Sequence, residues 1–174
     1  MRDVLVVVDM QLDFIDGALG TGEALAILPA AEAKIRDFSG PVLFTRDTHR
    51  EDYLKTQEGA LLPVPHCVKG TTGWQIHPRL EALRALPALD KPSFGSLALA
   101  DTLRQMDREE PVRSVTFIGL CTDICVISNA LIAKAALPEA RVIVDAACCA
   151  GATPEGHRNA LQAMKACQVI VENG

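Results

Sequence analysis

The stretch that decides the fold is VTFIGLCTDICV, residues 115–126. Its first four residues are mostly β-branched or aromatic and a glycine follows them, a pattern typical of a short buried strand. Thr122 and Asp123 are both good N-cap residues, so we expect a helix directly after the strand, with Cys125 in its first turn. A thiol there lies at the positive end of the helix dipole, which favours the thiolate. The stretch therefore predicts a nucleophile at the end of a buried strand, although most free cysteines are simply small buried hydrophobic residues.

Apolar runs without alternation recur along the chain, and they predict strands that are covered on both faces. We expect these strands at residues 4–8, 42–45, 88–91, 115–118, 141–145 and 169–171. Segments with helical periodicity lie between them, at residues 23–38, 76–86, 96–106, 123–136 and 153–167. Such alternation favours a parallel sheet with helices on both faces. The prediction is an α/β fold, a three-layer α/β/α arrangement with a central six-stranded parallel sheet, in a single domain spanning residues 1–174.

Composition excludes several classes of partner. The chain carries 17 basic and 22 acidic residues, a net charge of -5, and it has no basic stripe. This argues against binding to nucleic acid or to an anionic membrane surface. No apolar run could span a bilayer, and the run at residues 4–8 is too short for a signal peptide. Six cysteines without a CxxC pair indicate reduced thiols. We therefore expect a cytoplasmic protein that acts on a small-molecule substrate.

Polar residues follow the first four predicted strands. Asp9 follows the first, Asp47 and His49 follow the second, Lys91 ends the third, and Cys125 follows the fourth. Ligands bind at the carboxyl ends of parallel strands, so these side chains are candidates for one site, although polar residues are common in loops anyway. Acid, amine and thiol would form a coherent catalytic unit, in which a thiolate attacks a carbonyl and a carboxylate carries the proton. Partial burial at the end of an apolar strand would raise the pKa of Asp9.

Six segments that contain these residues resemble the isochorismatase-like cysteine hydrolases, the group that includes the nicotinamidases. They are VDMQLDF (8–14), TRDTH (45–49), PHCVKGT (65–71), DKP (90–92), GLCTDICV (119–126) and DAAC (145–148). Each segment is weak evidence alone. In this order and spacing they are specific for the superfamily, though not for one substrate, and the resemblance covers nearly all of the chain.

The resemblance implies a catalytic triad of Asp9, Lys91 and Cys125. It also implies a cis peptide bond between Leu120 and Cys121, which is rare when no proline is involved. Such a bond would direct the backbone N–H groups of Cys121 and Cys125 into one oxyanion hole, the device that stabilises charge in acyl transfer. Relatives assemble as homodimers or homotetramers, so the resemblance also implies an oligomer.

The same resemblance implies that Phe14 and Leu120 contact the substrate. Family members that cleave the vinyl ether of isochorismate lack the nucleophilic thiol, so Cys125 favours hydrolysis of a small amide through a thioester. The alternatives are another hydrolase of the superfamily, acting on a ureido, biuret-like or vinyl-ether substrate, and a thiol-based redox sensor that uses Cys121 and Cys125.

Nicotinamidases typically bind a divalent metal through one Asp and three His. Asp47, His49 and His66 match that pattern, but Lys55 stands at the remaining position, so we expect the site for zinc, iron or manganese to be incomplete. An Asp-x-His pair can also be a simple loop hydrogen bond. The covalent chemistry itself requires no cofactor. The aromatic residue that stacks on nicotinamide is missing too, and Trp74 is a candidate replacement or a core residue.

Three further residues have simpler interpretations. Asp145 is predicted to accept hydrogen bonds from loop N–H groups near the site. Asn129, which follows Cys125 on its helix, is predicted to meet a neighbouring helix or subunit. His157, on the last helix, is predicted to be a surface or packing residue.

Overall fold

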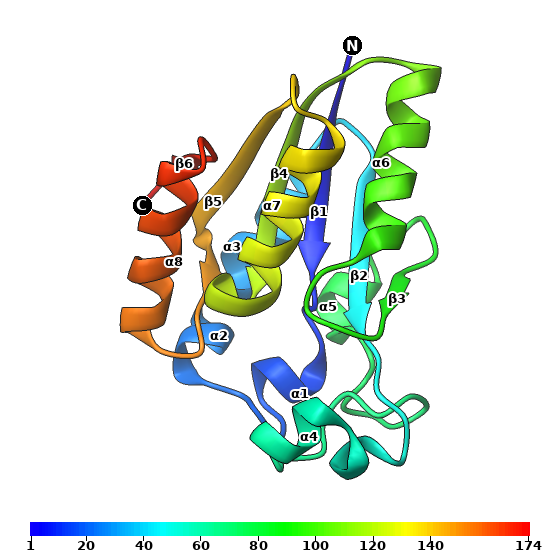
Figure 1. Cartoon of the computed structure of the whole chain (residues 1–174), viewed down its shortest axis with the longest axis vertical. Coiled ribbons are helices and arrows are strands. Elements are labelled where there is room, and N and C mark those ends of the chain that lie inside the picture. The colour runs from blue at the N-terminus through cyan, green and yellow to red at the C-terminus, as the bar shows by residue number, and fades with distance from the viewer.

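The computed structural model describes all of residues 1–174, and at its centre is a sheet of six strands (Figure 1). Neighbouring strands all pair in parallel, in the order β3-β2-β1-β4-β5-β6. The strands are β1 (Arg2–Val8), β2 (Val42–Asp47), β3 (Leu89–Lys91), β4 (Val112–Leu120), β5 (Arg141–Ala150) and β6 (Ile170–Glu172). The predicted α/β fold with a six-stranded parallel sheet is confirmed.

The central strand β1 shows why the apolar runs lack alternation. Residues 4–8 are all fully buried. Val4 and Val6 belong to one hydrophobic cluster, whereas Leu5 and Val7 belong to another. Because successive side chains of a strand point to opposite faces, the two clusters lie on the two sides of the sheet. A strand between two hydrophobic layers therefore needs apolar residues at every position.

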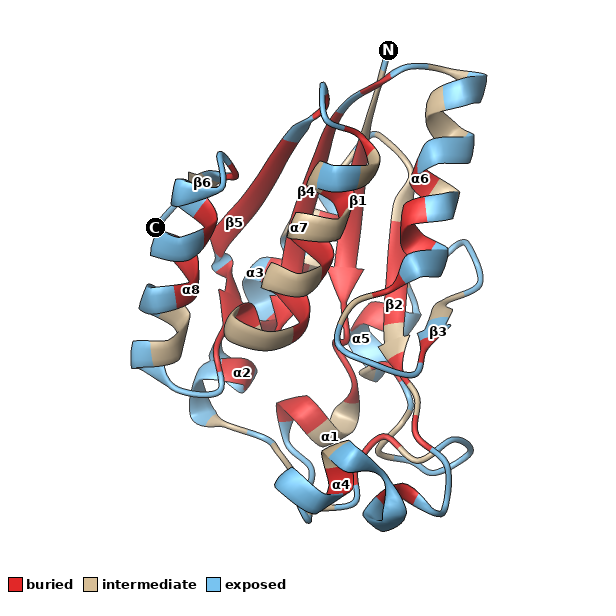
Figure 2. Ribbon diagram, viewed as in Figure 1, coloured by how far each residue is buried: buried red, intermediate tan, exposed pale blue.

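Helices cover both faces of the sheet (Figure 1). One face carries α6 (Leu97–Glu109), α7 (Ile127–Ala136) and α8 (Pro154–Ala166), and the other carries α2 (Gly22–Ala26) and α3 (Leu28–Asp37). In Figure 2 the strands and the inner sides of these helices are buried, and their outer sides are exposed. This is the predicted three-layer arrangement. None of the helices is both long and apolar enough to cross a membrane.

Short helices and loops gather beyond the carboxyl ends of the strands (Figure 1). They include α1 (Leu12–Ile15), the 3₁₀ helix Tyr53–Lys55 and α4 (Gln57–Leu61). The last two belong to the segment between β2 and β3, which the sequence leaves without periodicity. A long irregular segment in a compact domain is usually functional, and here it covers the edge of the sheet where ligands bind.

Two predicted helices differ from the observed ones. The helix predicted at residues 23–38 is divided into α2 and α3 at Ile27, because Pro29 lies in the first turn of α3 and has no N–H to continue a longer helix. The helix predicted at residues 76–86 is limited to α5 (Pro78–Glu81). Beyond it, N–H groups donate to carbonyls three residues back, so the chain tightens into turns.

The helix after β4 begins as a π-helical turn, Thr122–Val126, which leads directly into α7. The Val126 N–H donates to the Cys121 carbonyl, five residues back, at 3.0 Å. The predicted N-caps are wrong, because Cys121 occupies the cap position and makes no side-chain cap bond. The side chains of Thr122 and Asp123 instead form hydrogen bonds with residues in or just before α8.

The backbone has unusual conformations at this same edge of the sheet. Gly119 has φ +116°, and a Cβ there would lie 2.2 Å from the Val8 carbonyl oxygen, so only glycine fits. The Leu120–Cys121 peptide bond is cis, as the resemblance implied. Asp9, directly after β1, has φ +47°. These features redirect the chain where the two central strands end, and they place Asp9 and the turn that carries Cys125 side by side.

Candidate active site

Lys91 lies at the centre of a cluster of buried polar side chains. Its Nζ is 2.6 Å from Asp9 Oδ2 and 3.4 Å from Cys125 Sγ, and it also donates to the Ser93 carbonyl at 3.0 Å. Asp9 follows β1, Lys91 ends β3, and Cys125 lies in the turn after β4. None of the three is more than 4% exposed. The structure therefore brings together the three residues that the sequence predicts as a triad.

The surroundings of Asp9 suit a proton carrier. Thr45 Oγ1 donates to Asp9 Oδ1 at 2.7 Å, which leaves Oδ2 to the Lys91 ammonium. Burial raises the pKa of Asp9, and the nearby Lys91 ammonium opposes part of that rise. Burial by itself would lower the pKa of Lys91, but attraction by Asp9, Cys125 and Asp47 outweighs it, so the pKa of Lys91 lies above its ordinary value. The amine is therefore an ammonium throughout the neutral pH range.

Cys125 is a neutral thiol rather than the thiolate that its place in the first helical turn predicts. Burial raises the pKa of Cys125 well above its ordinary value, and the carboxylates of Asp9 and Asp47 raise it further. Lys91 acts in the opposite direction but does not outweigh them. The helix-dipole argument omits burial and the two negative charges, because both come from residues distant in the sequence. Attack by this sulfur therefore requires a base to take its proton.

The turn that carries Cys125 is tied to α8. Thr122 Oγ1 and His157 Nδ1 are 2.7 Å apart, and the Ala152 N–H donates to Asp123 Oδ1 at 2.9 Å. His157, predicted as a surface or packing residue, thus supports the nucleophile turn. Asp145 does not lie near the site as predicted. Asp145 lies on β5 and forms an ion pair with Lys34 of α3 at 2.8 Å. It also accepts a hydrogen bond from the Asn173 side chain in the C-terminal segment.

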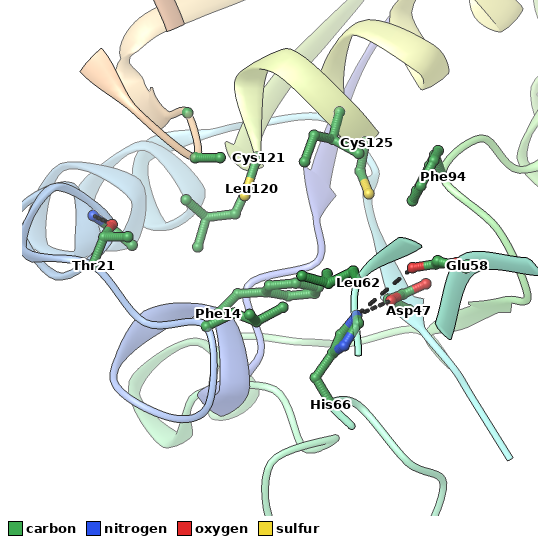
Figure 3. Close-up of a pocket in the computed structure, with 15 residues that line it drawn as sticks. Phe14, Thr21, Asp47, Glu58, Leu62, His66, Phe94, Leu120, Cys121 and Cys125 are labelled. Atoms are coloured by element: carbon green, nitrogen blue, oxygen red, sulfur yellow. Dashed lines mark hydrogen bonds and ion pairs between the residues drawn. The ribbon is translucent and has the colours of Figure 1, made fainter. Parts of the chain in front are cut away.

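A cavity of about 300 Å³ opens beside Cys125 (Figure 3). Fifteen residues line it, of which ten are hydrophobic, and none is Lys or Arg. Phe14 and Leu120 are among them, as predicted, and the Cys125 sulfur points into the space. Leu62 and Phe94 also line the cavity, and the sequence analysis identified neither. The size and the apolar walls suit a small organic molecule.

Trp74 does not contribute to this cavity. The Arg46 guanidinium carbon lies over its ring, 3.5 Å from the ring centroid. The Trp74 Nε1–H donates to Thr48 Oγ1 at 2.9 Å. The proposed replacement of a stacking aromatic by Trp74 is therefore wrong. The aromatic walls of the cavity are Phe14 and Phe94, which approach it from α1 and from the segment after β3.

Four side chains at one end of the cavity form a candidate metal site. Asp47, His49, Glu58 and His66 each offer one ligand atom, and these atoms lie within 4.8 Å of one another. The resemblance placed Lys55 at the fourth position, but Glu58 lies there instead. Lys55 is exposed at the end of the 3₁₀ helix. The next short helix, α4, points the Glu58 carboxylate into the cluster (Figure 3).

The sequence around Glu58 contains a signal for the start of a short helix, but this signal does not say what the helix packs against. Thr56 is the N-cap of α4, and its Oγ1 accepts a hydrogen bond from the Gly59 N–H at 3.0 Å. A Thr followed by an acidic residue two positions later is a common helix start. Recognising it would have placed Glu58 in a first helical turn. Which side of that turn meets the two histidines depends on the packing of the loop.

The geometry of the four groups fits a divalent cation. His49 Nε2 lies 2.9 Å from Asp47 Oδ2 and 3.6 Å from Glu58 Oε1, and it is buried without a well-directed hydrogen bond. His66 Nε2 lies 3.7 Å from Asp47 Oδ2 and 3.9 Å from Glu58 Oε1. Two imidazole nitrogens and two carboxylates that converge in this way are typical ligands of zinc, iron or manganese. The cluster is therefore compatible with a divalent metal.

Gln11 and Lys91 connect this cluster to Asp9 and Cys125. The Gln11 side chain accepts from the Asp47 N–H at 2.7 Å and donates to the Asp47 carbonyl at 2.8 Å and to the Trp74 carbonyl at 2.9 Å. This buried amide fixes the backbone at the end of β2. Lys91 Nζ also lies 3.3 Å from Asp47 Oδ1. Asp47 therefore faces the two histidines with one oxygen and the triad lysine with the other.

Buried polar side chains at the carboxyl edge of a parallel sheet, beside an apolar cavity, are typical of the ligand site of an α/β enzyme. Comparison with known proteins identifies the family. The family model of the isochorismatase domain matches residues 3–173. The chain belongs to the isochorismatase family.

Three similar proteins illustrate the range of the family. The nicotinamidase/pyrazinamidase of Mycobacterium tuberculosis is 29% identical over 180 aligned residues, which cover 95% of each chain. The pyrazinamidase of Pyrococcus horikoshii, solved in complex with zinc, is 28% identical with a TM-score of 0.79 and coverage of 98% of each chain. The N-carbamoylsarcosine amidase of Thermoplasma acidophilum is 26% identical with a TM-score of 0.75, covering 99% of this chain and 96% of the other.

Removing the charge of Asp9 and removing the charge of Lys91 should shift the pKa of Cys125 in opposite directions. Asp9→Asn removes a carboxylate that raises the pKa of Cys125, so the pH at which iodoacetamide reaches half-maximal reactivity should fall. Lys91→Met removes the ammonium that lowers this pKa, so the midpoint should rise. Alkylation of each cysteine is followed by mass spectrometry, with exposed Cys167 as the internal reference. An unchanged midpoint in both variants would mean that burial alone sets the pKa, and shifts in the same direction would contradict the opposite effects of the two charges.

Proposed function

We propose that the protein is a hydrolase that cleaves the C–N bond of a small amide, with Cys125 as the nucleophile. One observation carries the proposal: the Lys91 ammonium lies between the Asp9 carboxylate and the Cys125 sulfur at the wall of an apolar cavity. This arrangement supplies a nucleophile, a base and a compensating charge in one place. Two of the three similar proteins described above are named for amidase activity on nicotinamide or pyrazinamide, and the third is also named as an amidase.

The first step forms a bond between Cys125 Sγ and the amide carbonyl carbon. As it forms, the thiol proton moves to Asp9 and the carbonyl electron pair moves onto oxygen. The raised pKa of Asp9 makes this carboxylate a better proton acceptor than an exposed one. Lys91 keeps its proton and offsets the negative charge that passes from Asp9 to the developing oxyanion. The backbone N–H groups of Cys121 and Cys125 are the proposed donors to that oxygen.

The second step breaks the C–N bond. The oxyanion electron pair returns to the carbon, the amine leaves with the proton held by Asp9, and a thioester to Cys125 remains. Water then attacks the thioester, Asp9 accepts a proton from it, and collapse releases the carboxylic acid. The proton from Asp9 returns to the sulfur, which regenerates the thiol. One carboxylate thus serves as base and acid in both halves of the reaction.

The walls of the cavity indicate the chemistry of the substrate. Phe14, Leu62 and Phe94 present apolar surface, and no Lys or Arg lines the space to bind an anionic group. The polar end of the cavity presents Asp47 and Glu58, which repel a carboxylate when no cation lies between them. We therefore propose an uncharged amide with an aromatic or similarly apolar acyl group. This favours a nicotinamide-like substrate over the ureido acids, which carry a carboxylate.

Asp47, His49, Glu58 and His66 are the residues that would hold a divalent metal. When bound, such an ion supplies a Lewis acid that can orient or polarise a donor atom of the substrate. Without it, Asp47, Glu58 and His66 still line the polar end of the cavity. The proposed covalent steps use only Asp9, Lys91 and the turn that carries Cys125.

Substitution of Cys125 by Ala tests the nucleophile. Removing the attacking atom should lower turnover of a primary aromatic amide by about 10³-fold or more. Acid quenching during turnover, followed by intact-mass measurement, should reveal an acyl adduct on the unaltered protein and none on the variant. Cys167→Ala is the matched control, since this thiol is exposed and far from the cavity, and it should retain activity. Undiminished hydrolysis by Cys125→Ala would reject the mechanism, and reversible oxidation of Cys125 without any acyl adduct would favour a redox sensor.

A panel of amides tests the substrate class. We expect kcat/KM for nicotinamide, pyrazinamide or benzamide to exceed that for an N-carbamoyl amino acid of similar size by about 100-fold or more, because the cavity leaves the carboxylate unpaired. The methyl ester of the same N-carbamoyl amino acid separates charge from shape. It keeps the ureido group without the charge, so it should be a better substrate than the acid. Preference for the free acid would reassign the protein to the ureido hydrolases.

Metal addition tests the four-residue cluster. Zinc, manganese or iron(II), added to chelator-treated protein at about 100 times its Kd, should raise Tm by about 5 °C or more, since binding to the native state alone adds stability. Glu58→Gln should reduce this rise because it removes one charged ligand. Glu51→Gln is the control, an exposed acid in the same loop. Equal responses of the two variants, or no response of the unaltered protein, would exclude Glu58 as a ligand.

A further inference from the structure

Asn129 is a completely buried amide one helical turn after Cys125, on α7. Its Nδ2 donates to the Cys125 carbonyl at 2.8 Å and to the Phe94 carbonyl at 3.0 Å. Its Oδ1 accepts from the Ser96 N–H at 2.9 Å. Both amide hydrogens and the amide oxygen are therefore engaged, and the bonds reach two separate parts of the chain.

The second of these parts is the segment that carries the triad lysine. Residues 91–96 connect the short edge strand β3 to α6. Lys91 itself donates to the Ser93 carbonyl, and Phe94 forms one wall of the cavity. Strand β3 pairs with β2 over only three residues, Leu89 to Lys91. So short a ladder, at the edge of the sheet, holds the lysine weakly by comparison with a central strand.

We propose that Asn129 is a positioning residue that fastens residues 91–96 to the turn carrying Cys125. By this fastening, it holds Lys91 Nζ within contact of Cys125 Sγ and keeps Phe94 against the cavity. The consequence for turnover rests on the proposed hydrolase function. The consequence for the reactivity of the Cys125 thiol does not, because it depends only on where the ammonium lies.

The chemistry of the site requires an amide at this position. An aspartate of the same shape would still accept from the Ser96 N–H, but its other oxygen would face the Phe94 and Cys125 carbonyls with no hydrogen to donate. A serine hydroxyl would reach only the Cys125 carbonyl, four residues back. Neighbouring Ser128 makes the equivalent bond to the carbonyl four residues before it, that of Ile124, at 2.6 Å. Asn129→Ser should therefore keep the helix and lose the fastening.

The first experiment compares Asn129→Ser with Ser96→Ala. The Ser96 side chain caps α6 by accepting from the Leu99 N–H at 3.1 Å, so its loss lowers stability nearby without removing an Asn129 bond. We expect Asn129→Ser to lower kcat about 10-fold or more, since small displacements of a catalytic group are costly. Ser96→Ala should lower Tm and leave kcat within about 2-fold. Similar kcat losses in proportion to the Tm losses would overturn the proposal.

The second experiment is a double-mutant cycle with Lys91→Met, read by the rate of Cys125 alkylation relative to Cys167. If Asn129 acts through Lys91, Asn129→Ser should change the rate at least about 3-fold when Lys91 is present and much less when it is absent. Equal changes in both backgrounds would mean a purely structural role and would overturn the proposal. The alkylation cycle needs no substrate, so it decides the role of Asn129 even if the protein hydrolyses none of the amides. If Lys91→Met does not fold, the comparison with Ser96→Ala decides it.

Discussion

The buried ammonium of Lys91 is the charge around which the site is built. A cation without water is stable only if anions and hydrogen-bond acceptors surround it. Asp9 comes from the end of β1 and Asp47 from the end of β2, and both reach the same nitrogen. The parallel register makes this possible, because Asp47 and Lys91 are direct neighbours across the β2–β3 pair. Loss of that register would leave one positive and two negative charges buried without partners.

This shared lysine joins Asp9, Cys125 and the candidate metal ligands into one electrostatic unit. Asp47 faces Lys91 with one oxygen and His49 with the other. Two buried amides hold the backbone on either side: Gln11 fixes the end of β2, and Asn129 joins the lysine segment to the nucleophile turn. The backbone that carries Asp47, Lys91 and Cys125 is therefore held by hydrogen bonds from buried amides, which fix it more rigidly than contacts between long side chains would.

The neutral thiol and the apolar cavity have the same origin. Both follow from the exclusion of water at the carboxyl edge of the sheet, where loops and short helices cover the strand ends (Figure 1). Exclusion of water raises the pKa of Cys125 and of Asp9, and it leaves Phe14, Leu62 and Phe94 to contact whatever enters. At a site of this kind the thiol keeps its proton until a base is in place to remove it.

The sequence by itself determined the parallel sheet and indicated that Asp9, Lys91 and Cys125 would lie together at one edge of it. Strands buried on both faces need unbroken apolar runs such as residues 4–8, and the carboxyl ends of parallel strands converge whatever the loops do. Only the tertiary structure decided the protonation of Cys125, the position of Glu58 rather than Lys55 beside the two histidines, and the hydrogen-bond partners of Asn129. Each of these depends on what packs against a side chain from elsewhere in the chain. Local propensity carries no information about such contacts, because burial and charge act through space rather than along the sequence.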